Sequence, residues 1–290
     1  MGLRTKFNLV MLAAILAGLA VACVLAYELA FSNARRQVLQ EAAIMSGQAN
    51  AISDFTLKEI APLLVGQFHQ RFLPQSVPAW VAQTNFRALQ ASFPDYSYRT
   101  VVDNPTNPAD LPVAWQADII RVFKQQPELK EHVSERDTAS GRILSVSRPI
   151  IITNPACLQC HSTPAAAPAT MIDLYGSNNG FGWKLNEVIG AQIVSVPMSV
   201  PFAEAKRTFS LVVLGLVLVF AVMMVLLNLM LHFVIIQPVA LISAQAQAVS
   251  LGNMEAPDVV VRTRDEIGSL AESFNRMRRS LASAMKMLNE

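Results

Sequence analysis

The sequence predicts an α+β extramembrane domain held between two transmembrane helices and followed by a helical coiled coil. Three observations carry this prediction. The chain of 290 residues is 52% hydrophobic and only 15% charged, which is too apolar for an ordinary soluble protein. Two long uncharged runs divide it, and apolar residues recur at alternating steps of three and four near its carboxyl end.

The first uncharged run extends from Phe7 to Tyr27. At about 1.5 Å per residue, a helix of this length crosses a hydrocarbon core of about 30 Å. We therefore predict a transmembrane helix over residues 7–30 after a cytoplasmic tail over residues 1–6. A cleaved signal peptide is the alternative, although its apolar region is usually only about 7–15 residues long. Ala20-Val21-Ala22-Cys23 weakly resembles a lipoprotein processing site, whereas an inert apolar helix residue is the simpler interpretation of Cys23.

The second uncharged run follows Lys206 and Arg207 and predicts a transmembrane helix over residues 209–236. Residues 31–208 then form a domain of their own, and residues 237–290 form a carboxy-terminal segment. Lys and Arg total 23 against 21 Asp and Glu, a formal net charge of +2. A balance so close to neutral excludes the basic field that nucleic-acid binding requires.

The predicted domain over residues 31–208 mixes helical and strand patterns. Its predicted elements are a helix over 32–65, a strand over 97–102, a helix over 115–123, and strands over 142–152 and 188–196. Helices flanking a small antiparallel sheet make an α+β domain of ordinary size.

Two of the three cysteines stand in the run Cys157-Leu158-Gln159-Cys160-His161, between the last two predicted strands. This run contains C-x-x-C-H, the attachment pattern of a c-type haem. Two thiols three positions apart can each add to one porphyrin vinyl group, and the next residue then lies under the iron as an axial ligand. The pattern predicts one covalent haem held by Cys157, Cys160 and His161.

Two other interpretations of the motif are a structural zinc site and a redox pair. A structural zinc site needs further Cys or His ligands, and the domain has only His69 and His132 besides the motif. A thioredoxin-like redox pair usually opens a helix after a strand and needs no trailing histidine. Both alternatives fit the sequence less well than haem attachment does.

The sixth position on the iron separates electron transfer from ligand sensing, because a strong second ligand blocks small molecules. Candidates by ligand type are Met45, His69, His132, Met171 and Met198. Candidates for covering the porphyrin or pairing with its propionates are Tyr175, Trp183, Arg142 and Arg148.

Several stretches of the domain carry a family resemblance. They are Asp54-Phe55-Thr56, Ile60-Ala61-Pro62-Leu63-Leu64, Phe93-Pro94-Asp95-Tyr96-Ser97-Tyr98-Arg99, Asn104-Pro105-Thr106-Asn107-Pro108, the motif at 157–162, Gly180-Phe181-Gly182-Trp183-Lys184 and the stretch 190–198. Together they resemble the single-haem, PAS-like periplasmic sensor family that was long catalogued as a domain of unknown function. The resemblance implies a PAS-like fold with one covalent haem on Cys157, Cys160 and His161.

In that family the amino-terminal helix faces the distal side of the haem and in some members supplies a cysteine ligand. This chain has no cysteine in its outer helix, so Met45, Ser46 or a neighbour would take that place, or the site is open. Such haem is attached outside the cytoplasm. We therefore expect a multi-pass protein of the bacterial inner membrane, with the domain in the periplasm and both termini in the cytoplasm.

The carboxy-terminal segment carries two short helical patterns. Pro238 opens a short helix that stops near Gly252, and Asp265-Glu266-Ile267-Gly268 opens a second helix after an extended connector. The predicted seam residues are Val239, Ile242, Ala246 and Val249 in the first helix, and Ile267, Leu270, Phe274, Met277, Leu281, Ala284 and Leu288 in the second. This arrangement resembles a HAMP domain, and the resemblance implies a homodimer in a parallel four-helix bundle. We expect Arg276, Arg278 and Arg279 on solvated faces or near lipid headgroups.

Taken together, these patterns predict a sensor rather than an enzyme. Haem redox state or occupancy by a diatomic gas would shift the periplasmic domain, move the spans and change the HAMP-like bundle. The sequence ends at Glu290, so we expect a separate cytoplasmic signalling protein to supply the output, unless the chain given is truncated. The alternative is a membrane-anchored monohaem cytochrome that exchanges electrons with a periplasmic partner.

Overall fold

The computed structural model describes residues 2–139, 141–253, 256–261, 263 and 265–289, without the side chains of residues 3, 288 and 289. The side chain of the predicted seam position Leu288, and the outer ends of the predicted ranges 1–6 and 237–290, therefore lie outside the described residues. The chain divides into two compact units. One is Glu28–Thr208, and the other joins Met1–Tyr27 to Phe209–Glu290.

The unit Glu28–Thr208 is built on a four-stranded antiparallel sheet. Its strands are β1 (Ser97–Val102), β2 (His132–Thr138), β3 (Gly141–Ile151) and β4 (Val188–Pro197). They lie in the order β1-β4-β3-β2, so the chain crosses over between β1 and β2 and returns to place β4 at the centre. Apolar residues at every second position of β4 supply both faces, with Val194 and Val196 on one and Ala191 and Ile193 on the other.

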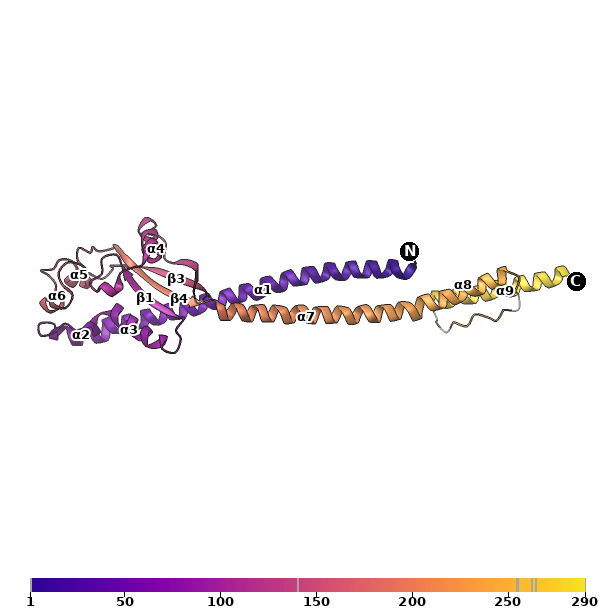
Figure 1. Cartoon of the computed structure of the whole chain (residues 1–290), viewed down its shortest axis with the longest axis horizontal. Helices are drawn as coiled ribbons and strands as arrows, with labels where there is room; N and C mark the ends of the chain where they lie inside the picture. Colours follow the sequence, from indigo (N-terminus) through magenta and orange to yellow (C-terminus); the bar gives the residue numbers. More distant parts are fainter. Residues whose placement is uncertain (1, 140, 254–255, 262, 264, 290) are drawn as a thin grey trace. The chain divides into compact units, whose positions relative to one another are not determined.

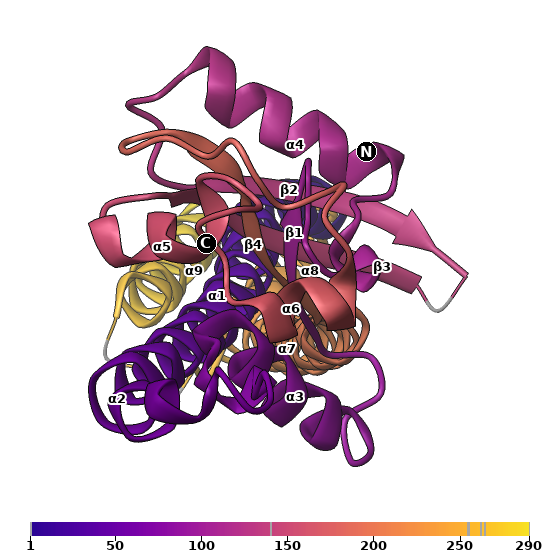
Figure 2. The ribbon, with the colours of Figure 1, turned by 90° about the vertical axis from the view of Figure 1, so that its left-hand side faces the viewer.

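Helices cover both faces of this sheet (Figure 2). The outer part of α1 (Leu3–Phe55) and α3 (Pro78–Gln90) pack on one face, where Val38, Ala42, Phe86, Val194 and Val196 share a core cluster. On the other face, α4 (Ala114–Gln125) buries residues such as Ile120 and Phe123 against the sheet. The result is a mixed helical and antiparallel fold, which confirms that part of the prediction.

The remaining elements of this unit are short. Beyond α1 the chain forms a π-helical turn η1 (Thr56–Ile60), α2 (Ala61–Leu64) and two 3-10 turns, η2 (Val65–Gln67) and η3 (Pro74–Ser76). A further turn η4 (Pro108–Asp110) precedes α4. The connection from β3 to β4 carries η5 (Pro155–Cys157), α5 (Leu158–His161) and α6 (Ala169–Tyr175). The C-x-x-C-H motif therefore lies between the last two strands, as predicted.

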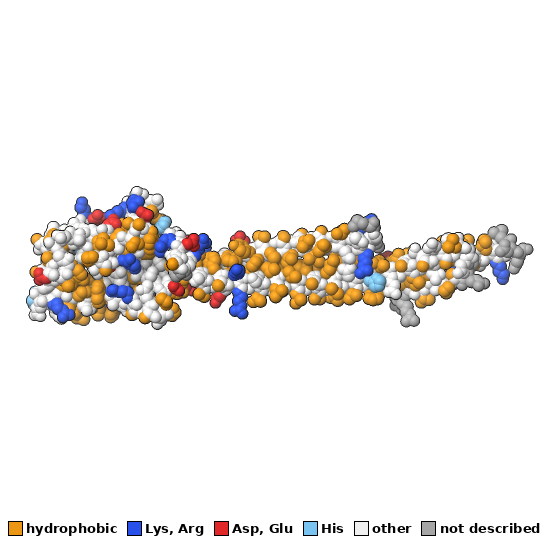
Figure 3. Space-filling model, viewed as in Figure 1, with side chains coloured by type: hydrophobic (Ala, Val, Ile, Leu, Met, Phe, Trp, Pro, Cys, Tyr) orange, Lys and Arg blue, Asp and Glu red, His pale blue; other side chains and the backbone are white. Residues whose placement is uncertain are grey.

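The second unit contains two helices that are long and apolar enough to cross a membrane. They are the first part of α1, and α7 (Ser199–Met230) continuing through a π-helical turn η6 (Leu231–Ile236). The two helices lie side by side, with the Tyr27 and Phe209 ring centroids 5.8 Å apart. Hydrophobic side chains dominate their surface (Figure 3), which suits contact with lipid rather than water.

After η6 the chain forms α8 (Gln237–Ser250) and α9 (Glu266–Asn289), which lie alongside each other (Figure 1). Ile242 and Val249 of α8 pack with Ala271 and Phe274 of α9. Asp265 starts α9, because its Oδ1 accepts from the backbone N–H of Ile267 and of Gly268, both at 3.0 Å.

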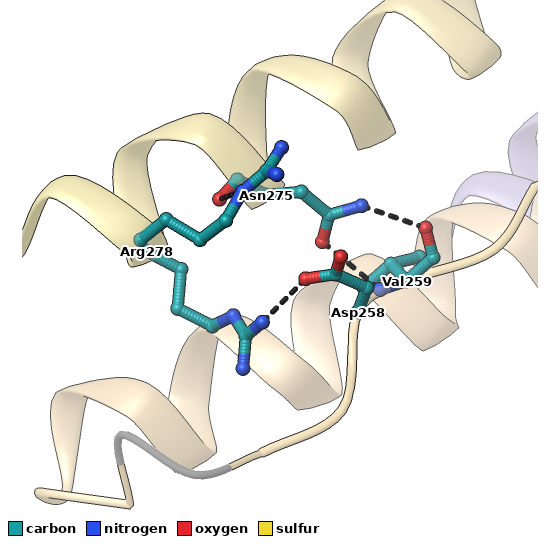
Figure 4. A network of polar contacts seen from close by, with 5 residues as sticks. Asp258, Val259, Asn275 and Arg278 are labelled. Carbon is teal, nitrogen blue, oxygen red and sulfur yellow. Dashed lines mark hydrogen bonds and ion pairs between the residues drawn. The ribbon is translucent and has the colours of Figure 1, made fainter. Parts of the chain in front are cut away.

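The connector between α8 and α9 is fastened by one buried side chain. Asn275 donates from Nδ2 to the carbonyl of Val259 and accepts at Oδ1 from its N–H, both at 2.9 Å (Figure 4). Beside it, Arg278 pairs with Asp258. These bonds hold the described part of the extended segment against α9.

The predicted seam of α9 divides in the single chain. Ile267 and Phe274 pack toward α8, whereas Leu270, Met277 and Leu281 are 49%, 61% and 43% exposed. The second group therefore forms an apolar stripe that α8 does not cover.

Candidate functional site

The C-x-x-C-H motif begins where β3 ends, and local polar contacts set its shape. Asn154 Oδ1 accepts from the N–H of Ala156 at 2.9 Å, which starts the 3-10 turn η5. The single helical turn α5 follows, so Cys157 and Cys160 lie three residues apart on neighbouring helical positions. Both are free thiols of intermediate exposure, and burial raises the pKa of each. The two thiols are thus protonated at neutral pH.

His161 is held by a backbone carbonyl from a distant part of the chain. Its Nδ1 lies 2.7 Å from the Gly180 oxygen, and because a carbonyl only accepts, Nδ1 must carry the proton. In the neutral ring, Nε2 then keeps its lone pair for a metal. Burial lowers the pKa of His161, partly offset by this bond, which favours the neutral ring.

Trp183 fixes the plane of the His161 ring. The two rings stack with centroids 3.9 Å apart and planes 13° apart. The backbone reinforces the stack, because Trp183 N–H donates to the His161 carbonyl at 3.2 Å and Gly182 N–H donates to the Ser162 carbonyl at 3.0 Å. The hydrogen bond at Nδ1 therefore holds one edge of the imidazole, and the stack with Trp183 holds one face.

Gly180 reaches His161 because it has no side chain. Its φ is +82°, and a Cβ there would lie 2.0 Å from Thr106 Oγ1 and 2.8 Å from Thr106 Cα, so only glycine fits. Asn104 fastens the same loop, accepting from Gly180 N–H at 3.1 Å and donating to the Phe181 carbonyl at 3.2 Å. The loop after β1 thus positions the acceptor that orientates the histidine.

An apolar wall lies behind the motif. Val102, Ile152 and Ile189 form its buried centre, and Cys157 and Trp183 pack against it together with Ile150 and Leu158. The wall comes from β1, β3 and β4, so the sheet and the loop together shape the motif's surroundings.

The other predicted ligands lie elsewhere. Met45 is 7% exposed and, with Met198, belongs to the core cluster between α1, α3 and the sheet, whereas Cys157 packs in the separate cluster of the motif. Met171 is buried on α6, His132 on β2 faces Phe123 at 6.5 Å, and His69 is exposed. The structure brings none of these into the motif's apolar cluster, and Met45 as the sixth ligand stays an untested prediction.

Of the four residues predicted to support the haem, one contacts the motif and three have other partners. Trp183 contacts His161, as described above. Tyr175 packs edge-on against Phe72 at 6.0 Å, and Arg142 pairs with Asp137 at 3.2 Å. Arg148 pairs with Glu131 at 2.9 Å. Among the residues that the structure describes, no three His, Cys, Asp or Glu side chains come together as a metal site.

Sequence reasoning missed the Gly180 carbonyl and Asn104. Both stand in stretches that carry the family resemblance, Asn104-Pro105 and Gly180-Phe181-Gly182-Trp183. A glycine pair around an aromatic residue signals an unusual loop, yet the bond from a backbone carbonyl to a ring 19 positions away leaves no mark on side-chain composition.

Comparison with known proteins gives two family matches. Residues 31–197 match the model of the Tll0287-like family, and residues 230–283 match that of the HAMP domain. The chain is also similar to the crystal structure of the cyanobacterial heme-protein Tll0287, with 18% identity, a TM-score of 0.44, and coverage of 55% of this chain and 94% of that one. No curated protein matches.

Proposed function

This chain belongs to the Tll0287-like family, and from that membership we propose that it is a membrane-bound sensor carrying one covalent c-type haem. The haem domain, for which we propose a PAS-like fold, lies in the periplasm. The HAMP domain at 230–283 passes the state of the haem to a separate cytoplasmic partner. We propose no enzymatic activity.

The observation that carries this proposal is the orientation of His161. The Gly180 carbonyl keeps the proton on Nδ1 at 2.7 Å, which leaves Nε2 as the ligand atom. Two free thiols precede the ring at the spacing that haem attachment requires. An apolar wall reaches Cys157, and a porphyrin needs such a wall. The residues present therefore fit the group.

Each residue has a distinct role in this proposal. Cys157 and Cys160 would hold the porphyrin through their thiols, and His161 would offer Nε2 to the iron. Trp183 restricts rotation of the imidazole, and the hydrogen bond to Gly180 raises the basicity of the ligand nitrogen. Bound haem would supply one-electron chemistry or reversible binding of a small molecule at the sixth position.

The exposed stripe on α9 supports the proposed homodimer. Leu270, Met277 and Leu281 follow one another at steps of seven and four, and all three are more than two-fifths exposed. A second copy in a parallel bundle would cover these residues. Movement of α7 would then reach the partner through a change in this bundle.

The test is to mature the full chain with haem and record its spectra oxidised, reduced, and reduced under carbon monoxide. We expect a covalent haem signal in the pyridine haemochrome assay. Replacing Cys157 and Cys160 by serine should abolish it, whereas Cys23→Ser, the matched control, should keep it. A wild-type chain without covalent haem would overturn the proposal.

The same spectra separate the two stimuli. A shift of the reduced spectrum under carbon monoxide means an open or weakly held sixth position and favours ligand sensing. An unchanged spectrum means two strong ligands and favours redox sensing. If Met45 is the sixth ligand, the reduced wild-type spectrum should not change under carbon monoxide, whereas that of Met45→Ala should shift.

Transmission needs its own measurement. In the Cys23→Ser background, single cysteines placed at Leu270 and Met277 should crosslink between copies at different rates in the two haem states. Equal crosslinking rates in the two haem states would contradict the sensor proposal. The remaining candidate would be a membrane-anchored electron carrier, which is consistent with the partial exposure of Cys157 and Cys160. A carrier truncated after Gln237 should keep its redox activity and its phenotype.

A further inference from the structure

A cavity of about 380 Å³ opens beside the sheet, in the same unit as the motif, and its lining includes Arg148 and Ile150. Its lining residues are Asn50, Lys130, Arg148, Pro149, Ile150, Ile151 and Gln192. The lining therefore combines three apolar side chains with two cations and two amides. A ligand that fits it has both an apolar body and an anionic group.

The cations exceed the anions around this cavity. Arg148 donates from Nε and Nη2 to the same Glu131 oxygen, at 3.0 and 2.9 Å, so this pair balances one positive charge. Lys130 is exposed and forms no ion pair with any residue that the structure describes. The cavity thus keeps a net positive charge that a carboxylate would neutralise.

The apolar lining of the cavity connects it to the motif. Ile150 lines the cavity and also packs against the cluster that includes Cys157 and Trp183. Ile150 is thus common to the lining of the cavity and to the apolar cluster of the motif.

We infer that this cavity binds a carboxylate carried on an apolar body, with Arg148 and Lys130 as its cationic partners. The carboxylate has two alternative sources. One is the propionates of the attached haem, and for this source the inference rests on the proposed function. The other source is a free dicarboxylate. Asn50 lies on α1, so either occupant touches the helix that continues toward the first span.

The first arm of the test measures the midpoint potential of the haem-loaded full chain. Lys130→Gln and Arg148→Gln should both lower it, because losing a cation beside a propionate stabilises the more positive, oxidised iron. Arg148→Lys should restore most of the wild-type value. Arg142→Gln is the matched control, an arginine on the same strand that pairs with Asp137 outside the cavity, and it should leave the potential unchanged.

The second arm titrates succinate into the wild-type chain and into Arg148→Gln by calorimetry. Binding that weakens at least tenfold in the variant supports the inference with a free carboxylate as occupant. Potentials unchanged in both cavity variants, together with no succinate binding, overturn it, as does an equal shift in Arg142→Gln.

The two proposals fail separately. A wild-type chain that attaches no haem removes the proposed function, while the succinate titration still tests the cavity. If Arg148→Gln does not fold, the potentials of Lys130→Gln and Arg148→Lys are compared with the wild-type value instead. Both variants keep a cation at position 148 that can pair with Glu131.

Discussion

Two asparagines fasten irregular segments in this chain, one in each compact unit, and their surroundings are opposite. Asn104 bonds to the backbone of Gly180 and Phe181 at 3.1 and 3.2 Å and is exposed. Asn275 makes the equivalent pair of bonds to Val259, both at 2.9 Å, and is only 8% exposed. Water can replace the hydrogen bonds of Asn104 but not those of Asn275. Loss of the Asn275 side chain should therefore cost more free energy than loss of the Asn104 side chain.

In each unit a glycine also lies close against a threonine. A Cβ on Gly180 would lie 2.0 Å from Thr106 Oγ1, and one on Gly268 would lie 2.1 Å from the Thr263 carbonyl. Only Gly180 also has a positive φ, at +82°. Gly180 is therefore required both by its positive φ and by the close approach of Thr106, whereas Gly268 is required by the close approach of Thr263 alone. The connector of the HAMP segment is held in addition by the buried Asn275 of α9.

The largest expected effect is that of Gly180→Ala. The substitution adds the cost of a left-handed backbone to an overlap with Thr106, together about 3–5 kcal/mol. Hydrogen exchange of amides 180–183 in the full chain measures it. The control is Gly182→Ala, whose φ is +81° but whose Cβ meets nothing within 4 Å, and it should cost only about 1–2 kcal/mol. Equal costs would contradict the role given to the close approach.

The next effect is that of Asn275→Ala. It leaves the N–H and carbonyl of Val259 buried without partners, at about 2–3 kcal/mol in total. Deuterium uptake by peptides over 256–261 should rise sharply. Ser280→Ala, on the exposed side of α9, should leave that uptake unchanged.

A smaller effect is expected from Asn104→Ala. Solvent can reach the freed groups of Gly180 and Phe181, so the loss should be about 0.5–1.5 kcal/mol. The same exchange measurement over 180–183 reports it. A loss as large as that of Asn275→Ala would refute burial as the origin of the difference.

The smallest effect concerns pH. Hydrogen bonds from the backbone, the strongest from Gly268, lower the pKa of Asp265. A lowered folded pKa means that the stabilisation is present above the unfolded value of about 3.9 and is lost as pH falls through the folded value. Protection factors of the first turn of α9 should therefore fall at acidic pH. Asp265→Asn keeps a capping side chain and should remove this pH dependence.

Elements with strong periodicity were predictable from the sequence. The strand over 97–102 coincides with β1, the helix over 115–123 lies within α4, and the long outer helix is confirmed to Phe55. The strand β2 was not predicted, because His132–Thr138 carries Glu135, Arg136 and Asp137 on the sheet edge, where charge protects against further pairing. The helix α3 was also missed, since it opens at Pro78 and buries only Ala82 and Phe86.

The candidate site was predictable only as far as its side chains form a local pattern. Cys157, Cys160 and His161 stand together in the sequence, so their spacing alone indicates a shared role. The atoms that orientate His161 come from Gly180 and Trp183, which the fold brings close through backbone bonds. Backbone acceptors have no residue type, which is why composition does not reveal them.

The π-helical turn η6 (Leu231–Ile236) has a consequence for direction. A π turn holds one residue more than an α turn, so every side chain after it is offset by about 100° around the axis relative to an unbroken α-helix. Ile242 and Val249 therefore meet α9 at an azimuth that α7 alone does not set. The single inserted residue therefore sets which face of α8 is aligned with a given face of α7. A rotation of α7 about its axis would turn the α9-contacting face of α8 from that starting angle.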